Sequence, residues 1–274
     1  MVTFAPTTEI PALATSFSRV RLSSGVTLHC ATQGLNNGPA VIMLHGITDS
    51  WFSFSRVLPL LPADLRVVVP DLRGHGDSER PAQGYRIRDL ADDVLRLMDA
   101  MAIDTAVVVG HSMGSFVARK MYQLEPARIT RLVLAGAGAS ARNPGMLELV
   151  AAVNELTDPV DEKFVRDFQM SCVHAPVPEA FMETAIANSR RVPARVWKAA
   201  FQGLLEDDIA LSRPPVRTLV VGGRKDAVFS ATEQMVLARQ FPRGELHLVD
   251  DVGHTLHWEQ PATFVSALIR FGIS

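Results

Sequence analysis

Residues 105–114 read TAVVVGHSMG, and this stretch decides the fold because it joins a buried strand to a helix through a tight turn. The β-branched run at 105–109 predicts a strand that is covered on both faces. Gly110 and Gly114 stand two residues to either side of Ser112, where a strained turn has room only for small neighbours. A serine can also simply begin a helix, but this setting favours an exposed nucleophile at the top of a sheet.

A serine hydroxyl is a weak nucleophile by itself, so Ser112 needs a base, and that base needs an orienting carboxylate. Asp226 closes the loop GGRKD after a strand predicted at 216–221, and His254 lies in the loop DVGH after a strand predicted at 245–249. The carboxyl ends of parallel strands meet at one edge of a sheet, where ligands bind. The chain order therefore predicts a catalytic triad of Ser112, Asp226 and His254.

The tetrahedral oxyanion formed in acyl transfer needs hydrogen-bond donors, and two backbone amides are candidates. The N–H of Met113 directly follows the predicted nucleophile. The loop after a strand predicted at 40–44 reads HGIT, and its glycine lets the chain bend so that the N–H of Ile47 points to the same place. Taken alone, the His-Gly pair is more typical of an ordinary turn after a strand. Together with the triad it predicts an oxyanion hole made by Ile47 and Met113.

Short apolar strands alternate with helical patterns along the rest of the chain. Alternating polar and apolar residues at 17–22 and 26–33 predict a half-buried hairpin around the turn Ser24-Gly25. Apolar runs typical of strands covered on both faces lie at 40–44, 66–69, 105–109, 131–135, 216–221 and 245–249. Helical periodicity follows at 86–101, 113–124, 231–241 and 261–271. This order predicts a mostly parallel sheet with helices on both sides and antiparallel strands at one edge.

The segment 138–215 interrupts this alternation because it contains no buried strand. Its patterns are helical, rich in Phe, Met and Ala, and punctuated by prolines, which predicts about four short helices. Since it lies between two predicted strands, we expect a helical insertion in a core made of residues 1–137 and 216–274.

These residues together resemble the α/β-hydrolase superfamily, in the form that carries a helical cap. The resemblance runs from about residue 17 to the end of the chain and includes PDLRGHGDS at 70–78, to which we assign a structural role, and the closing segment around Glu259-Gln260-Pro261. It implies an eight-stranded, mostly parallel sheet flanked by helices, with a cap inserted after the sixth strand at 138–215. Relatives that open epoxides or displace halide carry Asp as the nucleophile, whereas Ser112 fits acyl transfer through a serine ester.

Composition and charge exclude several partner classes. The chain has 274 residues, is 47% apolar, and balances 27 basic against 29 acidic side chains, which argues against a nucleic-acid-binding surface. No apolar run is long enough for a secretory signal or a membrane span. Cys30 and Cys172 are too few for a disulfide framework. We therefore expect a cytoplasmic protein with two reduced thiols, no nucleic-acid or membrane partner, and a monomeric or homodimeric state.

We expect neither a metal ion nor a cofactor. His29, His75, His174 and His247 have no ligand-like companions in the sequence, and His257 lacks further ligands near the predicted catalytic histidine. The Gly-x-Gly after the strand at 131–135 is not followed by the third glycine and acidic residue that a nucleotide site needs.

The predicted function is a serine hydrolase that cleaves carboxylic esters or lactones of small to medium, largely uncharged substrates. Apolar cap residues would form a roof over the nucleophile, since ligand pockets are mostly apolar with few polar anchors. The aromatic residues expected to contact substrate are Trp51, Phe52, Phe168 and Trp197. Two polar residues receive structural roles, Asp49 as the cap of a helix beginning near Ser50 and His111 as a packing residue.

Two other functions stay open on the sequence. The same triad serves relatives that hydrolyse a carbon–carbon bond in diketone-like compounds. Some proteins with this fold act instead as ligand-binding receptors or scaffolds, although an intact set of Ser112, Asp226 and His254 argues against a degenerate site.

Overall fold

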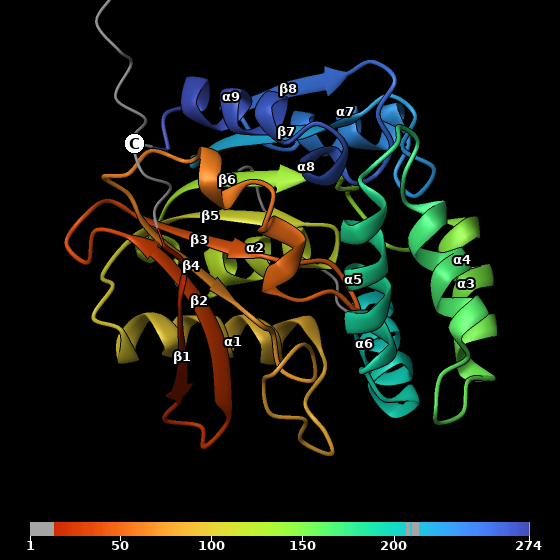
Figure 1. Ribbon diagram of the computed structural model, residues 1–274. Coiled ribbons are helices and arrows are strands. Elements are labelled where there is room, and N and C mark those ends of the chain that lie inside the picture. Colours follow the sequence, from red (N-terminus) through yellow and green to blue (C-terminus); the bar gives the residue numbers. More distant parts are fainter. Residues whose placement is uncertain (1–13, 207–208, 210–213, 274) are drawn as a thin grey trace, which may run out of the picture.

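One eight-stranded sheet forms the centre of the molecule (Figure 1). The computed structural model describes residues 14–206, 209 and 214–273. The remaining residues of the predicted core and insertion lie outside the described part. The strands are β1 Ser16–Arg21, β2 Thr27–Gly34, β3 Ala40–Leu44, β4 Arg66–Pro70, β5 Ala106–His111, β6 Ile129–Ala135, β7 Arg217–Gly223 and β8 Gly244–Val249.

The strand order is β1-β2-β4-β3-β5-β6-β7-β8. The hairpin β1–β2 and the pair β2–β4 are antiparallel, and every other neighbouring pair is parallel. The hairpin turns at Gly25, whose φ of +89° favours glycine. The predicted mostly parallel sheet with antiparallel strands at one edge is therefore confirmed.

The parallel strands are apolar throughout because both of their faces are covered. In β3, Val41 and Met43 pack into one apolar core, and Ile42 and Leu44 pack into the other. The same alternation continues in the register partner Val108 of β5 and its neighbours. A run of consecutive apolar residues is thus the signature of a central strand here.

Helices cover each face of the sheet. Those that pack into the core with Ile42 and Leu44 are α1 Ile87–Ala100, α2 Met113–Leu124 and α7 Ala231–Arg239. The opposite face is covered by α9 Pro261–Phe271, the short α8 Leu256–Glu259, and the 3₁₀ turns η1 Trp51–Phe54 and η2 Leu58–Leu60, and a third 3₁₀ turn, η3 Pro126–Arg128, precedes β6. Four residues long, α8 was not predicted because it is too short to show a helical period.

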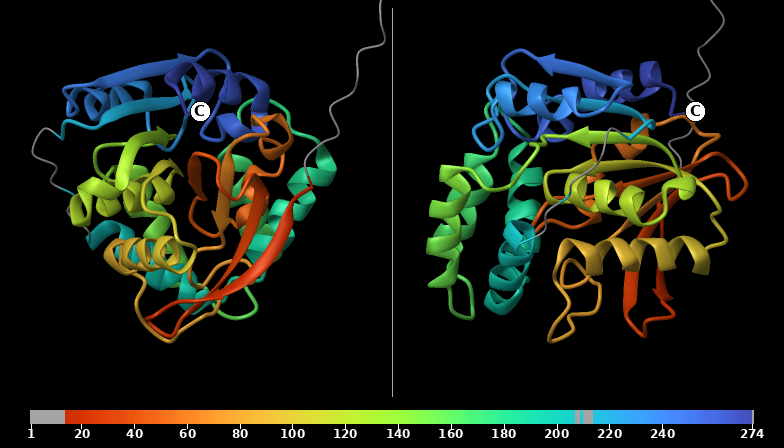
Figure 2. Two further views of the ribbon diagram at one scale, coloured as in Figure 1. Left: turned by 90° about the vertical axis from the view of Figure 1, so that its left-hand side faces the viewer. Right: turned by 180° about the vertical axis from the view of Figure 1, so that it is seen from behind.

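The predicted insertion forms four helices between β6 and β7. They are α3 Pro144–Asn154, α4 Glu162–Ser171, α5 Glu179–Arg190 and α6 Ala194–Glu206. Side-chain caps begin two of them, since Asn143 accepts a hydrogen bond from Met146 N and Asp161 accepts one from Phe164 N. Figures 1 and 2 show these helices stacked side by side beyond the carboxyl ends of the parallel strands. We call the four helices the cap.

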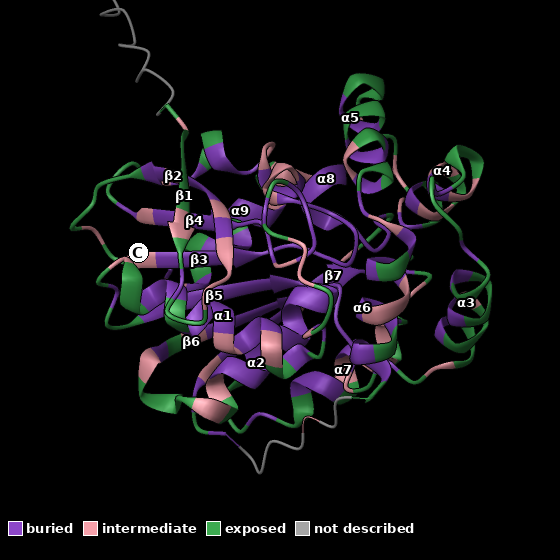
Figure 3. Ribbon diagram, turned by 90° about the horizontal axis from the view of Figure 1, so that it is seen from below, coloured by how far each residue is buried: buried purple, intermediate pink, exposed green. Residues whose placement is uncertain are grey.

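Burial follows the layers of the fold. Figure 3 shows buried residues along the parallel strands and on the inner sides of the helices, with exposed residues on the outer sides of α3, α4 and α5. Both cysteines are free and buried, and burial raises the pKa of the Cys30 thiol to about 12. Among the described helices, none has the length and apolar character needed to cross a lipid bilayer.

Candidate active site

Ser112 sits in the strained turn between β5 and α2. Its φ of +50° lies in the region that L side chains rarely adopt. A Cβ on Gly110 would overlap the backbone of Gly114, and a Cβ on Gly114 would overlap the carbonyl of Leu44. The turn is held by the amide of Ser112, which donates to Ala135 O at 3.0 Å. The two glycines are therefore required by close backbone approach, as their spacing predicted.

Asp226 and His254 are paired across the loops after β7 and β8. Asp226 Oδ2 lies 3.0 Å from His254 Nδ1, and both side chains are buried. The other carboxylate oxygen accepts from the amides of Val228 at 2.8 Å and Phe229 at 2.9 Å. Because an ionised carboxylate only accepts, Nδ1 carries the proton of the neutral imidazole, which leaves Nε2 as a base. His254 Nε2 is thereby available toward the pocket that it shares with Ser112.

The backbone of His254 is held by a strand and by the cap. Its amide donates to Cys172 O at 2.9 Å, just after α4. Its carbonyl accepts from His111 Nε2 at 3.2 Å, at the end of β5. A Cβ on Gly136 would lie 2.6 Å from the same carbonyl. His111 thus fixes the loop that carries His254, and it also lines the pocket, which the predicted packing role did not include.

Glu259 joins the histidine loop to the cap. Its carboxylate accepts from the amide of Gly253 at 3.0 Å, from those of His174 at 3.1 Å and Ala175 at 2.6 Å, and from the hydroxyl of Thr255 at 3.2 Å. The sequence had indicated Glu259 only as part of a matching closing segment. The structure gives it a physical role, since one buried carboxylate ties residues on both sides of the pocket.

The loop after β3 contributes an amide without a hydrogen-bond partner, among the described residues, to the pocket that Ser112 also lines. Neither Ile47 N nor Met113 N donates a hydrogen bond to another segment in the described part of the chain, and Ile47 lines the pocket. His45 holds the loop, because its Nδ1 donates to Gly46 O at 2.7 Å and its Nε2 accepts from Leu72 N at 3.0 Å. Burial lowers the pKa of His45, which keeps this doubly bonded imidazole neutral.

A pocket of about 60 Å³ lies between the strand ends and the cap. Its lining residues are Gly46, Ile47, Asp49, His111, Ser112, Met146, Leu149, Phe168, Gln169, Ser171, Cys172, Phe201, Val228, His254, Thr255 and Trp258. An open groove of about 470 Å³ beside α3 shares Met146, Leu149, Ser171 and Val228 with it. A small closed pocket thus continues into a larger apolar groove.

Of the four aromatic residues expected to contact substrate, Phe168 lines the pocket and the other three do not. Trp51 lies edge-on to Phe17, and Phe52 stacks on Phe181 of α5 with ring centroids 5.0 Å apart. Trp197 is fully buried beneath Phe168 and its neighbours within the cap. These three predictions are wrong because aromatic content alone does not say which face of an element meets the pocket.

Asp49 is not the helix cap that the sequence predicted. The side chain of Ser50 caps η1 by accepting from Phe52 N, and Asp49 lines the pocket with only 8% of its surface exposed. Burial raises the pKa of Asp49 to about 6, opposed by hydrogen bonds from Gln169 and Ser53. Asp49 stands two residues after the predicted oxyanion-hole residue Ile47, and this position was a signal that it lies at the pocket. Nothing in the sequence indicated Gln169.

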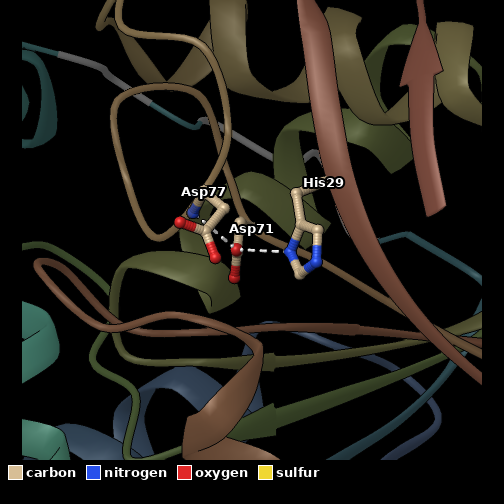
Figure 4. A group of neighbouring side chains, drawn as sticks. All are labelled: His29, Asp71 and Asp77. Atoms are coloured by element: carbon tan, nitrogen blue, oxygen red, sulfur yellow. Dashed lines mark hydrogen bonds and ion pairs between the residues drawn. The ribbon is translucent and has the colours of Figure 1, made fainter. Parts of the chain in front are cut away.

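His29 has acidic companions, contrary to the prediction (Figure 4). Its Nδ1 lies 2.8 Å from Asp71 Oδ2, which also accepts from the amide of Asp77 at 2.9 Å. The other Asp71 oxygen accepts from Trp51 N at 2.6 Å, and Asp77 forms an ion pair with Arg191. Both oxygens of the central carboxylate are therefore occupied by groups of the protein itself, and the hydrogen bond with Asp71 raises the pKa of His29. This donor set fits a structural turn better than a metal site.

A hydroxyl, an imidazole oriented by a carboxylate, and two free amides are the groups needed for acyl transfer through a covalent intermediate. All of them come from the carboxyl ends of parallel strands or the loops that follow. The pocket between them is mostly apolar and is closed on one side by α3, α4 and α6.

Comparison with known proteins places these features in a wider group. A family model described as the alpha/beta hydrolase fold matches residues 39–261. The 2-hydroxymuconate semialdehyde hydrolase of a Pseudomonas species is 30% identical over 278 residues, covering 95% of each chain. The structure of the 2-hydroxy-6-oxo-6-phenylhexa-2,4-dienoate hydrolase from a Rhodococcus species matches with a TM-score of 0.79 at 25% identity, covering 96% of this chain and 100% of that one. The esterase RhEst1 from a Rhodococcus species matches with a TM-score of 0.83 at 24% identity over 93% and 98%, which is a likeness of fold.

Proposed function

The chain belongs to the alpha/beta hydrolase family, and we propose that it is a serine hydrolase that cleaves carboxylic esters or lactones through an acyl-enzyme on Ser112. The observation that carries this proposal is the pairing of Asp226 with His254 at 3.0 Å, in a pocket that Ser112 also lines. Burying polar groups without hydrogen-bond partners costs free energy. The pocket nevertheless gathers a serine hydroxyl, a free imidazole nitrogen and two unused amides, which a catalytic role would explain.

The reaction would proceed in two halves. His254 Nε2 takes the proton of Ser112 Oγ as that oxygen attacks the carbonyl carbon, and the N–H groups of Ile47 and Met113 hold the oxyanion. Collapse of the tetrahedral intermediate expels the alcohol, which takes the proton from His254. Water then gives a proton to His254 and attacks the acyl-enzyme, which releases the acid and restores Ser112. Asp226 keeps the imidazole in the required tautomer and stabilises its cationic form.

The pocket supports a small to medium, uncharged substrate. Among its described lining residues none is Lys or Arg, and the remaining walls are mostly apolar. A closed volume of about 60 Å³ is well below the several hundred Å³ of a typical ligand site. One end of the substrate would therefore be short, and the other would extend into the groove beside α3.

A second candidate function is hydrolysis of a carbon–carbon bond. It is favoured by the curated relative whose name specifies 2-hydroxymuconate semialdehyde, at 30% identity. The structural neighbour named for a dienoate acts on a carboxylate. In the present pocket the one carboxylate, Asp49, faces the cavity without a basic side chain among the described lining residues, so an anionic substrate would meet like charge. This difference favours ester cleavage.

Covalent labelling tests the proposal directly. We expect a fluorophosphonate probe to label the protein and p-nitrophenyl acetate and butyrate to be hydrolysed. Replacing Ser112 by Ala should abolish labelling and reduce ester turnover by about 10⁴-fold or more. Absence of both labelling and turnover in the folded, unmodified protein would contradict the proposal and favour a ligand-binding scaffold. Turnover that survives in Ser112→Ala would show that the nucleophile is another residue.

The candidate carbon–carbon activity needs its own substrate panel. Dienoates with a vinylogous diketone, the class named for the two relatives, would be compared with matched uncharged esters on the same protein. We expect a higher kcat/KM for the esters. The opposite order would replace the ester proposal by the carbon–carbon alternative.

A further inference from the structure

Asp49 is a buried carboxylate that the proposed triad does not use. Its Oδ1 accepts from Gln169 Nε2 at 3.1 Å, and its Oδ2 accepts from Ser53 Oγ at 3.3 Å. Both donors are neutral side chains, and no backbone amide or cation contacts the carboxylate in the described part of the chain. An ionised carboxylate offers about four acceptor positions, so half of the capacity of Asp49 remains free.

The hydrogen bonds around Ser53 are consistent with an ionised Asp49. Ser53 Oγ accepts from Trp258 Nε1 at 2.9 Å and lies 2.9 Å from His257 Nε2. Burial lowers the pKa of His257 to about 3, so its imidazole is neutral. If His257 Nε2 donates to Ser53, the hydroxyl proton goes to Asp49, and every polar atom of Ser53 has a partner. The network therefore supplies one donor to Asp49 and no second one from this side.

A second acceptor lies beside Asp49 in the pocket wall. His111 Nε2 bonds the carbonyl of His254, so Nε2 carries the proton and Nδ1 is left as an acceptor. His111 Nδ1 is buried without a partner. Both His111 Nδ1 and Asp49 Oδ2 lie within about 3 Å of the point where a Cβ on Gly46 would stand, at 3.0 and 3.1 Å. All three residues line the pocket, so one acceptor without a partner and one carboxylate oxygen with spare acceptor capacity border the same small space beside Gly46.

From this arrangement we propose that Asp49 and His111 form an acceptor subsite that binds a hydroxyl group of the substrate. The inference rests on the proposed ester hydrolysis and names the class of ester, one that carries a hydroxyl on its acid or its alcohol part. The hydroxyl donates its proton to Asp49 Oδ2, and the neighbouring His111 Nδ1 disfavours any group that offers only a lone pair.

A hydroxyl fits this space better than other polar groups. Carbonyl and carboxylate oxygens would face two acceptors without a proton to share. An ammonium group would have to lose its hydration in a pocket of about 60 Å³ whose other walls are mostly apolar. A neutral hydroxyl needs the smallest desolvation and gains a hydrogen bond to a charged acceptor.

The test uses two pairs of esters that differ by one group. Methyl 3-hydroxybutyrate and methyl 3-methylbutyrate exchange a hydroxyl for a methyl on the acid part. The pair 2-hydroxyethyl butyrate and propyl butyrate makes the same exchange on the alcohol part. The measured quantity is the ratio of kcat/KM for the hydroxylated ester to that for its methyl counterpart, in the unmodified protein, in Asp49→Ala and in Asp49→Asn.

We expect the ratio in at least one pair to be about tenfold larger in the unmodified protein than in Asp49→Ala, because a hydrogen bond to a charged group is lost. Asp49→Asn retains the shape of the side chain and one acceptor oxygen, which can stay bonded to Gln169, so it reports the same loss, several-fold smaller, if Asp49→Ala does not fold. Thr184→Ala is the control, since Thr184 is not a lining residue of the pocket and its hydroxyl donates to Ala180 O within α5, and its ratio should equal that of the unmodified protein.

Ratios in both pairs that are the same in the unmodified protein and in the folded Asp49 variants would overturn the subsite. Fluorophosphonate labelling of each variant shows independently that the nucleophile is intact. Loss of the proposed function itself would look different, because the unmodified protein would then fail to react with the probe and with all four esters.

Discussion

Two buried carboxylates flank the pocket, and they are held in opposite ways. Asp226, in the loop after β7, is 7% exposed, and Asp49, in the loop after β3, is 8% exposed. Asp226 accepts from two backbone amides, from His254 Nδ1 and, at 3.4 Å, from Gln234 Nε2. Within the described residues, Asp49 accepts only from the side chains of Gln169 and Ser53. Equal burial therefore accompanies very different hydrogen bonding.

The difference separates a positioning carboxylate from a recognising one. Backbone donors set the orientation of Asp226 through the turn itself, and all its acceptor capacity is used within the protein. Asp49 is left with free capacity in a space where charge is costly, and burial raises its pKa to about 6. Most buried polar groups in folded proteins are hydrogen-bonded, so the free capacity of Asp49 points to a donor from outside the chain, which is the basis of the proposed subsite.

Replacing each aspartate by asparagine is the strongest test of the different roles proposed for Asp226 and Asp49. Asp226→Asn should lower kcat/KM for every ester by about 10⁴-fold, because the amide favours the wrong imidazole tautomer. Asp49→Asn should change kcat/KM by only a few-fold for the esters that lack the hydroxyl group. Steady-state kinetics on methyl 3-methylbutyrate check both values. Equal losses in the two variants would contradict the division of roles.

The exchange Asp49→Asn, which weakens the proposed recognition of substrate, should make the folded protein more stable. Burial raises the pKa of Asp49 from 3.8 to about 6, so the folded protein binds this proton more tightly than the unfolded chain does. Ionisation above about pH 6 therefore destabilises the fold, by up to about 3 kcal/mol. Asp49→Asn removes this cost, and we expect it to unfold at a higher temperature than the unmodified protein near pH 8, with the advantage vanishing near pH 4.

Calorimetry at the two pH values measures this difference. Asp64→Asn, which removes an exposed carboxylate, is the control and should show no comparable gain. A melting temperature for Asp49→Asn that is lower than that of the unmodified protein near pH 8 would mean that the carboxylate is stabilised by contacts other than those of Gln169 and Ser53.

The loops that carry Asp226 and Asp49 also differ in how far they could be predicted from the sequence. The strand ends that carry Ser112, Asp226 and His254 were located because β-branched runs, glycines and loop order are local signals. The hydrogen bond of Asp226 to His254 follows from where parallel strands end. The sheet and the helices were predictable for the same reason.

The cap was predictable only as a set of helices. Which of its side chains meet the pocket depends on how α3, α4 and α6 pack on the core, and periodicity does not contain that information. Phe168 was placed correctly, whereas Trp197 turned out to lie beneath it. Gln169, on the same helix as Phe168, was missed because an interior glutamine has no local signature. The sequence predicted Asp49 as a helix N-cap, because Asp or Asn residues before a helix usually have that role.

Selectivity between the paired esters should depend on pH. Ionised Asp49 is a stronger acceptor than its acid form, so the preference for the hydroxylated ester should rise as pH increases through about 6. Other titratable groups face Asp49, namely His111, His254, His257 and Cys172. Burial lowers the pKa of His111 and His257 and raises that of Cys172, which keeps these three neutral in this range. Both esters use the same proposed triad, so a pH effect on the triad cancels in the ratio.

The ratio would be measured from about pH 5 to pH 8 in the unmodified protein and in Asp49→Asn. We expect about a tenfold rise in the first and a flat profile in the second. A rise of the same size in Asp49→Asn would assign the titration to another group, and the proposed role of the Asp49 charge would have to be abandoned.

The smallest effect concerns what holds the Asp49 loop in place. Ser189 of α5 is fully buried, donates to Thr48 O at 3.0 Å and accepts from Gln169 Nε2 at 2.6 Å. Thr48 has a φ of +64°, a strained value for a β-branched residue. Cap side chains therefore position the loop that carries Asp49 and Ile47, whereas the Asp226 turn is positioned by its own backbone.

Ser189→Ala should accordingly lower kcat several-fold, with little change in KM, on the esters that lack the hydroxyl. The variant holds the Ile47 amide less firmly, and this amide acts on the negative charge that develops in the transition state. The ester ratio should also fall, since Gln169 is no longer held against Asp49. Thr184→Ala on the same helix is the control, because the Thr184 hydroxyl bonds only Ala180 O in its own helix. If Ser189→Ala lowered stability while leaving kcat and the ester ratio equal to those of Thr184→Ala, the cap would cover the pocket without positioning the loop, and the contrast between the two carboxylates would rest on Asp49 alone.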